Sequence, residues 1–384
     1  MAFADLYTKF KKTPQWALMA ATRENSPWHR EDSVAIHTEM VLEEFHKICF
    51  DSDFITEREY NITAVAILFH DAGKPAARKE KETEERGKYS VFSGHESVSS
   101  RLFEDFYCAN ESMFAGVLVR EDVHKVMWII ENHLPYQVKK SEKFQAIRDA
   151  LEHNLDGMET AFFNHLLSDS RGRMPDADYV KAGEVEEWCE LVMSLDVSMM
   201  RDTVNKPTMY VLIGASGSGK SSFSKRLEKI NCFSNKPVHY FSLDACRLEY
   251  AEKMGEAGGE NQKDQYRTAY QYCDTHRSMF RHWADTEFMI KLKQYQDIII
   301  DNTNVSRKTR AMYTTEARKR GYRVVAVMFP ITLAEVLKRQ GARSDKYVPD
   351  EAVTRQYMGV QVPFVGTEVD SISVCWDNLE KGPK

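Results

Sequence analysis

The sequence has no run of eighteen or more apolar residues, and its first residues, MAFADLYTKFKK, lack the apolar core of a secretion signal. We therefore expect no membrane segment and a cytoplasmic location. Its seven cysteines include no Cys-x-x-Cys pair, so we expect reduced thiols with mostly structural roles. Internal repeats and low-complexity tracts are also absent. A chain of 384 residues is long enough for two ordinary domains with separate cores.

The net charge of −6 is unevenly distributed along the chain. Residues 206–384 carry 28 Lys and Arg against 21 Asp and Glu, so the acidic excess lies in the residues before them. The C-terminal half is therefore the better candidate for contact with a polyanion. Nine of the twelve histidines lie before residue 200, and this bias points to metal binding in the N-terminal half.

The apolar pattern changes near residues 200–206. Before this point apolar residues recur at helical spacing, which predicts an all-α helical bundle over residues 1–203. Over residues 204–384 apolar runs alternate with helical segments, which predicts an α/β unit with a mainly parallel, doubly wound sheet and ligands at the carboxyl ends of its strands. Within this unit we expect a long helical tract at residues 262–295 and a basic helix at residues 307–323 that contacts nucleic-acid phosphates or is simply solvated.

A glycine-rich loop follows the first apolar run of the second half. GASGSGKS, from Gly214 to Ser221, fits the pattern G-x-x-x-x-G-K-[ST], in which backbone N–H groups wrap a phosphate. Lys220 would neutralise the β- and γ-phosphates of ATP, and Ser221 would hold Mg²⁺, at the positive end of the following helix. The expected nucleotide contacts are Gly214, Ser216, Gly217, Ser218, Gly219, Lys220, Ser221 and Ser222.

Residues beyond this loop favour group transfer over nucleotide hydrolysis. Asp244 follows an expected strand, where a carboxylate can accept the proton of an attacking hydroxyl, and Arg247 shares its helical face. A helix-capping aspartate and a surface arginine are an equally open interpretation. Asp301 ends another expected strand, but Asn302 stands where motor ATPases have a second acidic residue. An Asn-Lys-x-Asp guanine signature is absent, which disfavours a switch GTPase.

Two late arginines, Arg339 and Arg343, are four residues apart and share one helical face if their helix extends that far. Arginines in this position can close over a triphosphate and stabilise charge on the transferred phosphoryl group. Gly341 between them indicates that the helix can break and that the segment can move as a lid.

Phe69-His70-Asp71 is the sharpest feature of the helical half. A lone His-Asp pair is weak evidence, but imidazoles and carboxylates in its company suit a first-row transition metal or Mg²⁺, and six such groups can hold two ions. The six candidate ligands are His37, His70, Asp71, His95, His133 and Asp169.

The remaining polar residues of this half carry weaker signals. Lys74 is expected either to help neutralise a phosphate or to be an exposed lysine at a helix end, and Arg173 has the same two interpretations. We expect ordinary structural roles for the histidines that have no motif partner, which are His46, His124, His153 and His165.

From about Trp28 to about Arg173 the order H…HD…H…H…D resembles the HD phosphohydrolase superfamily, and it looks most like the HD domain attached to bacterial tRNA nucleotidyltransferases. The resemblance implies a helical bundle acting on phosphomonoesters and 2′,3′-cyclic phosphates at RNA ends. It implies that His95 and His133 complete a second metal site or hold the substrate phosphate. It also implies that one metal is ligated by His37, His70, Asp71 and Asp169.

Residues 206–365 resemble the 5′-OH polynucleotide kinase family through the loop, Asp244 with Arg247, the DNTN run at 301–304 and the two late arginines. The resemblance implies that Lys220 and Ser221 bind ATP and Mg²⁺, that Asp244 is the general base, and that Arg247 holds a phosphate of the acceptor strand. Arg339 and Arg343 would clamp the donor. The whole chain resembles the HD-domain polynucleotide kinases, and it has no D-x-D-x-[TV] signature of a haloacid dehalogenase phosphatase.

These resemblances together imply a bifunctional enzyme that heals broken RNA or DNA ends. The kinase half would phosphorylate 5′-OH ends, and the HD half would remove 3′-phosphate or 2′,3′-cyclic phosphate, leaving ends for an RNA ligase. Two alternatives remain open. One is an HD nucleotide hydrolase fused to a small-molecule kinase, and the other is an ATP-dependent binding module whose HD residues hold a structural metal. The sequence leaves open a homo-oligomer, the preference between RNA and DNA, and the identity of the HD-site metal.

Overall fold

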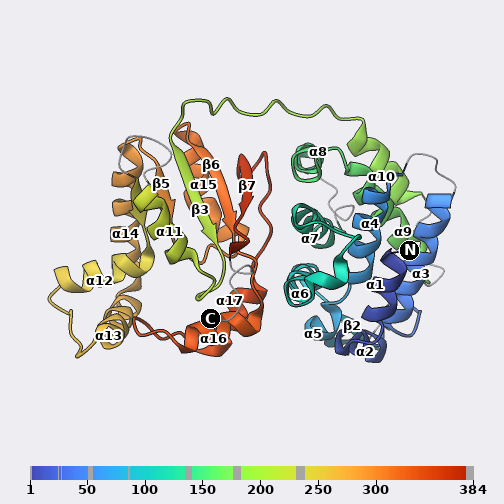
Figure 1. Cartoon of the computed structure of the whole chain (residues 1–384), viewed down its shortest axis with the longest axis horizontal. Helices are drawn as coiled ribbons and strands as arrows, with labels where there is room; N and C mark the ends of the chain where they lie inside the picture. The colour runs from blue at the N-terminus through green and yellow to red at the C-terminus, as the bar shows by residue number, and fades with distance from the viewer. Residues whose placement is uncertain are drawn as a thin grey trace. The chain divides into compact units, whose positions relative to one another are not determined.

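The computed structural model describes residues 2–24, 26, 28–50, 55–84, 87–134, 141–175, 183–230 and 238–377. The chain forms two compact units, Met1–Met199 and Met200–Lys384. The first unit consists mainly of helices, and the second combines a sheet with helices (Figure 1).

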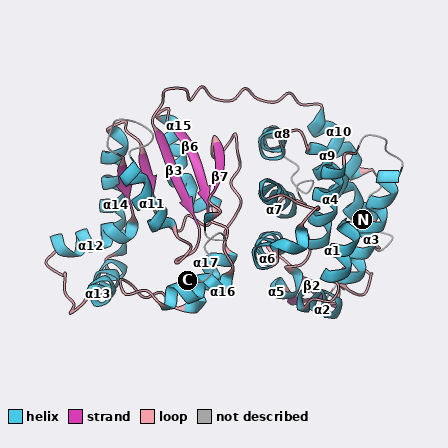
Figure 2. Ribbon diagram, in the orientation of Figure 1, coloured by secondary structure: helices cyan, strands magenta, loops and turns pink. Residues whose placement is uncertain are grey.

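The predicted helical character of the first unit is confirmed (Figure 2). One correction concerns a small antiparallel hairpin of β1 (Lys79–Thr83) and β2 (Gly87–Val91). Its first strand, KEKET, is exposed along its whole length, so it lacks the apolar alternation by which strands are predicted. The helices are α1 (Ala2–Phe10), α2 (Pro14–Ala21), α3 (Val34–Phe50), α4 (Glu57–Phe69), α5 (Lys74–Ala77), α6 (His95–Ala109), α7 (Val123–Glu131), α8 (Ser141–Leu155), α9 (Glu159–Arg171) and α10 (Glu184–Met193), with 3-10 turns η1 (Glu111–Phe114) and η2 (Arg120–Asp122).

Helix α4 is the centre of the first unit. A capping box starts it, because the Thr56 side chain accepts the backbone N–H of Glu59 and the Glu59 carboxylate accepts that of Thr56. Every residue from Asn61 to Phe69 is buried, as expected for a helix that is enclosed on all sides. Helices α1, α3, α6, α7 and α9 pack against it. Because α4 ends at Phe69, the next two residues, His70 and Asp71, enter the middle of the bundle.

The second unit contains one sheet whose five strands are all parallel, which confirms the predicted α/β class. The spatial order is β4-β5-β3-β6-β7, so the first strand of the unit lies in the middle. The last strand was not expected from the sequence, because its four residues are at most partly buried. The strands are β3 (Thr208–Ile213), β4 (His239–Phe241), β5 (Ile298–Ile300), β6 (Arg323–Met328) and β7 (Ser371–Val374).

The helical tract predicted at residues 262–295 is interrupted. His276 leaves the helical conformation, with φ −105° and ψ 37°, so two helices form in place of one. The helices of the unit are α11 (Lys220–Ile230), α12 (Leu243–Lys253), α13 (Gln262–Thr275), α14 (Arg277–Lys293), α15 (Arg307–Lys319), α16 (Leu333–Gly341) and α17 (Asp350–Met358).

The strand order places a ligand site beside the end of β3. The chain leaves β3 toward β4 on one side of the sheet, whereas it leaves β6 toward β7 on the other. Such a reversal between neighbouring strands opens a crevice at their carboxyl ends, where open α/β sheets bind ligands. The glycine-rich loop that follows Ile213 therefore lies at this crevice.

Six cysteines in the described ranges are free thiols, and Cys232 lies outside the described residues. None of the helices in these ranges has both the length and the apolar character needed to traverse a bilayer.

Candidate functional site

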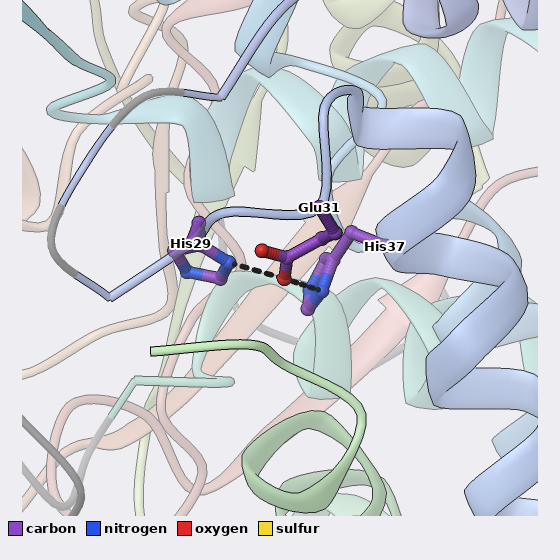
Figure 3. Close-up of side chains that lie close together, drawn as sticks. All are labelled: His29, Glu31 and His37. Carbon is purple, nitrogen blue, oxygen red and sulfur yellow. Dashed lines mark hydrogen bonds and ion pairs between the residues drawn. The ribbon is translucent and has the colours of Figure 1, made fainter. Parts of the chain in front are cut away.

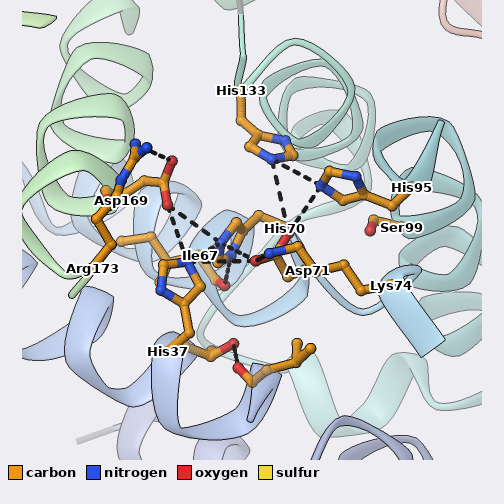
Figure 4. A network of polar contacts seen from close by, with 12 residues as sticks. His37, Ile67, His70, Asp71, Lys74, His95, Ser99, His133, Asp169 and Arg173 are labelled. Atoms are coloured by element: carbon orange, nitrogen blue, oxygen red, sulfur yellow. Dashed lines mark hydrogen bonds and ion pairs between the residues drawn. The ribbon is translucent and has the colours of Figure 1, made fainter. Parts of the chain in front are cut away.

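The six predicted ligands of the helical half come together inside the bundle (Figure 4). His37 belongs to α3, Asp169 to α9 and His95 to the first turn of α6, whereas His133 follows the end of α7. His70 and Asp71 follow α4 directly. All six are buried, with at most 6% of any of them exposed. Residues separated by up to 132 positions thus face one small volume.

Two groups of three ligand atoms form within this volume. The first group is His37, His70 and Asp169, and the second is Asp71, His95 and His133. In the first, His37 Nε2 lies 3.1 Å from Asp169 Oδ1 and 3.3 Å from His70 Nε2. In the second, His95 Nε2 lies 3.3 Å from His133 Nε2.

The Asp71 carboxylate connects the two groups. Its Oδ2 atom lies 3.1 Å from His70 Nε2 and 3.4 Å from His37 Nε2. Its Oδ1 atom lies 3.0 Å from His95 Nε2 and 3.9 Å from His133 Nε2. One carboxylate therefore offers an oxygen to each group, which is the arrangement that a pair of neighbouring cations requires.

Backbone carbonyls fix the tautomers of three histidines. The Nδ1 atoms of His70, His95 and His133 lie 2.7, 2.8 and 2.7 Å from the carbonyl oxygens of Ile67, Phe92 and Ile130, so each Nδ1 must donate a proton. In its neutral form, each of these rings would present an Nε2 lone pair to the neighbouring rings and carboxylate oxygens. Lone pairs at such distances repel unless a proton or cation lies between them. The donor set therefore fits one or two divalent cations of the imidazole-binding kind.

Electrostatics keep both carboxylates of the centre ionised. Burial alone would raise the pKa of Asp71, but the neighbouring His70 and Lys74 outweigh it and hold the pKa well below its ordinary value. For Asp169 the opposing charge comes mainly from Arg173. Burial lowers the pKa of His133 strongly, with further contributions from His95 and His70. These three side chains are therefore in the charge state that ligates a metal.

Of the two interpretations predicted for Lys74 and Arg173, the exposed one is wrong, and a role in neutralising a phosphate stays a prediction. Lys74 is buried, and its Nζ lies 2.7 Å from Asp71 Oδ2 and 2.8 Å from Glu24 Oε1. Arg173 Nη2 lies 3.3 Å from Asp169 Oδ2. Neither cation is a solvated lysine or arginine, because both are paired with carboxylates of the centre. Their contacts give them the role of balancing its negative charge.

A carboxylate that was not expected from the sequence orients His37 (Figure 3). Glu31 Oε1 lies 3.0 Å from His37 Nδ1 and 3.0 Å from His29 Nδ1. Glu31 is buried, and these two imidazoles lower the pKa of its carboxyl group although burial opposes the shift. Burial alone would lower the pKa of His37, but its bonds to Asp169 and Glu31 raise it to about 10. Glu31 therefore lies beside Nδ1 while Nε2 faces the other potential ligands, and a cation that binds Nε2 has to displace its proton.

Glu31→Gln is expected to weaken divalent-metal binding to the N-terminal unit by about 10- to 100-fold, because a neutral amide holds the imidazole of His37 less firmly. Titration with Mn²⁺ or Zn²⁺ measures the change. Glu44→Gln, on the same helix as His37 but at a partly exposed ion pair, serves as the matched control. Equal metal affinity in all three proteins would contradict an orienting role for Glu31.

His165, predicted to be ordinary, belongs to this centre. It lies in α9 four residues before Asp169, so the two share a helical face. Its ring centroid is 5.3 Å from that of His70 and 5.8 Å from that of His133. Burial lowers the pKa of His165 to about 3, and the nearby His70 contributes. The spacing of four from Asp169 was the signal in the sequence that could have identified it.

The glycine-rich loop of the second unit makes the tight turns that its glycines permit, and its binding of phosphate stays a prediction. Gly217 and Gly219 have positive φ values of 91° and 99°, which side chains rarely tolerate. Lys220 is buried, and its Nζ lies 2.8 Å from the Gly214 carbonyl oxygen and 2.7 Å from that of Ala215. Ser221 lies exposed in the first turn of α11.

Other predicted nucleotide contacts lie along the same loop. The Ser216 backbone N–H donates to Gln356 Oε1 of α17 at 3.0 Å. Ser218 is buried, and Ser222 is exposed beside Ser221. A Cβ at Gly214 would lie 2.5 Å from Ser218 Oγ, so this glycine permits the close turn of the loop.

Lys220 provides a pH test of the loop. Burial lowers its pKa to about 8, with a contribution from the nearby Lys346. Above this pH the free protein holds mostly neutral Lys220, whereas bound phosphates favour the charged amine. We therefore expect ATP binding to take up about one proton between pH 8 and 10 and ATP affinity to fall by up to about tenfold per pH unit. Calorimetry in buffers of different ionisation enthalpy measures the uptake, and Lys220→Met should abolish it.

Asp244 lies in the first turn of α12, just beyond β4, and Ser242 is the residue that caps the helix. The helix-capping interpretation of Asp244 is therefore wrong. Its Oδ1 atom accepts hydrogen bonds from Arg247 at 2.6 Å and from the Tyr266 hydroxyl at 2.8 Å, and its Oδ2 atom pairs with Lys346. Burial would raise the pKa of Asp244, but Lys346 and Arg247 lower it.

Arg247 is not a plain surface arginine. Its guanidinium lies over two rings, 5.0 Å from the centroid of Tyr270 and 5.6 Å from that of Phe280, while it also pairs with Asp244. Tyr266 and Lys346 were not expected from the sequence. Both contact Asp244, which is 22 residues from Tyr266 and 102 residues from Lys346 in the sequence, and no motif has either spacing.

The DNTN run holds the strand ends in place. Asp301, just after β5, is buried and accepts the Tyr240 hydroxyl at 2.8 Å. Asn302 Oδ1 accepts the backbone N–H of Leu243, at the start of α12. The Asn304 amide donates to the carbonyls of Leu212 and Ile300, which belong to adjacent strands. These bonds tie the loop region after β3 to the end of β5.

The two late arginines do not share one helical face. Helix α16 ends at Gly341, so Arg339 lies inside it and Arg343 lies beyond it. Arg339 Nε donates to Glu335 at 2.8 Å, and Arg343 Nε donates to Asp345 at 2.8 Å. The glycine ends the helix at the position where the sequence indicates a break, and this is why the expected alignment fails.

The basic helix α15 uses much of its charge inside its own unit. Arg310 is fully buried and pairs with Glu368. Arg318 Nη1 lies 2.8 Å from Asp370 Oδ1, and Arg320 pairs with Glu316 one turn before it. Arg310 and Arg318 thus stabilise the packing of the C-terminal segment, and contact of the helix with nucleic-acid phosphates stays a prediction.

Comparison with known proteins bears on the second unit. A family model described as an AAA domain matches residues 209–363, which run from β3 to beyond α17. The second unit has a P-loop α/β fold. No curated protein matches the chain. Among the matching solved structures is that of a Pnkp1/Rnl/Hen1 complex, which is 19% identical over 38% of this chain and 41% of that chain, with a TM-score of 0.25. The match therefore spans less than half of that chain's length.

Proposed function

We propose that the chain is a bifunctional enzyme that repairs nucleic-acid ends, transferring the γ-phosphate of ATP to a 5′-OH and removing 3′-phosphate or 2′,3′-cyclic phosphate. The observation that carries the proposal is the meeting of six buried potential metal ligands, Asp71 among them, in one unit of a chain whose other unit has a P-loop. Two separate phosphate-handling sites in one polypeptide suit a substrate with two damaged ends.

The kinase reaction follows from the contacts of the second unit. The loop N–H groups and Lys220 would hold the phosphates of ATP, and Ser221 would hold Mg²⁺. The acceptor oxygen would attack the γ-phosphorus as the bond to the β-γ bridging oxygen breaks, and the hydroxyl proton would pass to Asp244. Because Lys346 pairs with Asp244, this lysine has to leave the carboxylate before the proton can be accepted.

The charges around Asp244 support a role in binding the acceptor. Arg247 is held over Tyr270 and Phe280, so its guanidinium lies beside the carboxylate and offers a rigid group to a strand phosphate. Burial is the main cause of the lowered pKa of Lys220, and Lys346 and Arg343, both in the segment after α16, add to it. Arg339 and Arg343 would then clamp the donor from that segment.

The phosphatase reaction rests on the buried ligands of the first unit. One or two divalent cations bound there would polarise the phosphoryl oxygens and supply hydroxide near neutral pH. His37, His70 and Asp169 would hold one cation and His95 and His133 the other, with Asp71 shared between them. Lys74 and Arg173 would keep the site from accumulating negative charge as the phosphate enters.

A short RNA with 5′-OH and 2′,3′-cyclic phosphate ends tests the proposal. Incubated with ATP, Mg²⁺ and a panel of Mn²⁺, Co²⁺, Ni²⁺ and Zn²⁺, it should acquire a 5′-phosphate and lose its terminal phosphate, giving ends that an RNA ligase joins. A DNA of the same sequence, tested beside the RNA, measures whether the enzyme prefers ribose or deoxyribose ends. Phosphorylation of free nucleosides as fast as of the oligonucleotide would overturn the end-repair proposal and favour a small-molecule kinase.

A further inference from the structure

His165 has no structural partner that explains its position. It is fully buried in α9, and both ring nitrogens lack a hydrogen-bond partner among the residues that the structure describes. Its buried neighbours along the helix include Phe162, Phe163 and Leu166, and also Asn164, Ser168 and Asp169. Buried polar groups are nearly always hydrogen-bonded, so an imidazole at this position indicates a group that binds to it from outside the chain.

The ring of His165 has the same spacing to the ligands as they have to one another. It lies 5.3 Å from the His70 ring and 5.8 Å from the His133 ring. The ligand pairs His37–His70, His70–His133 and His95–His133 are 5.3, 5.3 and 5.2 Å apart between ring centroids. His70 belongs to the first group and His133 to the second, so His165 stands beside both.

His165 is nevertheless not placed as a metal ligand. The three groups of potential metal-ligating atoms found over the described ranges include His29, Glu31 and the six predicted ligands, but not His165. An imidazole beside a cation pair, but outside its ligand sets, can contact what the cations bind. A neutral imidazole has one N–H donor and one acceptor nitrogen, and a phosphate oxygen accepts such a donor.

We propose that His165 donates a hydrogen bond to an oxygen of the phosphate bound between the two ligand groups, and is thus a catalytic residue of the terminal phosphatase. The proposal rests on the phosphatase function proposed above. It assigns to one side chain the task of holding the tetrahedral oxyanion in place against the two cations. It also explains why a fully buried imidazole of α9 has no hydrogen-bond partner among the residues that the structure describes.

His165→Leu separates this role from packing and from metal binding. Leucine fills a similar apolar volume and removes both unsatisfied nitrogens, so the variant should fold and melt at the same or a higher temperature. We expect it to bind Mn²⁺ with parental stoichiometry and affinity, to bind inorganic phosphate at least about tenfold more weakly, and to hydrolyse the RNA end on the order of 10²-fold more slowly. His124→Leu, at another histidine of the same unit, is the control.

Three results would overturn the inference. Phosphate affinity and turnover within about threefold of the parent would show that His165 only packs, since lost catalytic hydrogen bonds cost more. Loss of a bound metal equivalent would make it a ligand instead. If the leucine variant does not fold, His165→Asn is compared with His165→Ala, and equal phosphate affinity in the two, where asparagine keeps an N–H donor, would count against the hydrogen bond.

A spectroscopic measurement on the parent protein distinguishes failure of the inference about His165 from failure of the phosphatase proposal. With ¹⁵N-labelled histidine and Zn²⁺ bound, inorganic phosphate should shift the imidazole signal that is missing in His165→Asn. If phosphate binds and this signal does not move, only the role of His165 fails. If the parent neither binds phosphate nor acts on the RNA end, the phosphatase proposal fails with it.

Discussion

Asp71→Asn should lose terminal-phosphate removal by a factor on the order of 10³ or more while it retains the ATP-dependent phosphorylation of 5′-OH ends. The reason is that the Asp71 carboxylate supplies one oxygen to each ligand group, at 3.1 Å from His70 and 3.0 Å from His95. A neutral amide of the same size cannot balance the charge of two cations. Its N–H₂ group also has no lone pair for a cation, so one of the two ligand groups would lose an oxygen ligand. The RNA with 5′-OH and cyclic phosphate ends reports both reactions in one tube.

Loss of stability is the competing explanation for this variant, because Asp71 also neutralises the buried Lys74. Removing one partner of a buried ion pair costs about 3–5 kcal/mol. Asp122→Asn is the matched control, since Asp122 is equally buried in the same unit and pairs with Arg58 at 2.6 Å, away from the ligands. If Asp122→Asn loses the phosphatase to the same extent at the same melting temperature, Asp71 has no special role.

Lys220→Met should show the opposite pattern, with 5′-phosphorylation reduced by about 10³-fold or more and terminal-phosphate removal unchanged. Lys220 is the buried amine of the loop, and the β- and γ-phosphates would replace the Gly214 and Ala215 carbonyls as acceptors for its Nζ. Methionine keeps the length of the side chain and removes the charge. A radiolabelled γ-phosphate on ATP measures transfer to the RNA.

The folded state should tolerate this substitution. Because burial lowers the pKa of Lys220 to about 8, its charged form is disfavoured in the nucleotide-free protein, and methionine relieves that penalty. The melting temperature should therefore stay equal or rise. Lys225→Met, at an exposed lysine of the same helix, controls for the change of charge on α11. A kinase that survives Lys220→Met would place nucleotide binding elsewhere in the chain.

Short-range patterns were sufficient for the regular elements and for the motif residues. The helical periodicity of the first half and the apolar runs of the second predicted the class of each unit correctly, and the spacing of the glycine-rich loop predicted its position after the central strand. The hairpin β1–β2 was not predicted, because its first strand consists mainly of charged residues and does not alternate apolar with polar residues. The helix break at His276 was not predicted, because no proline or glycine stands at this position.

The residues that the sequence missed are those that act through a partner far along the chain. Lys346 meets Asp244 across 102 residues, and Tyr266 meets the same carboxylate across 22. Glu31 precedes His37 by six residues, outside any helix, so no periodicity connects them. The spacing of four between Arg339 and Arg343 predicted that they share one helical face. This prediction failed because α16 ends at Gly341, between the two residues.

The order of residues along the chain was thus enough to predict the class of each unit and to select candidate residues for the two sites, because periodicity and motif spacing are local properties of the sequence. How these side chains are charged, oriented and balanced emerged only from the folded chain. Helices α3, α6 and α9 bring His37, His95 and Asp169 to the end of α4, and burial there removes the water that would otherwise screen their charges.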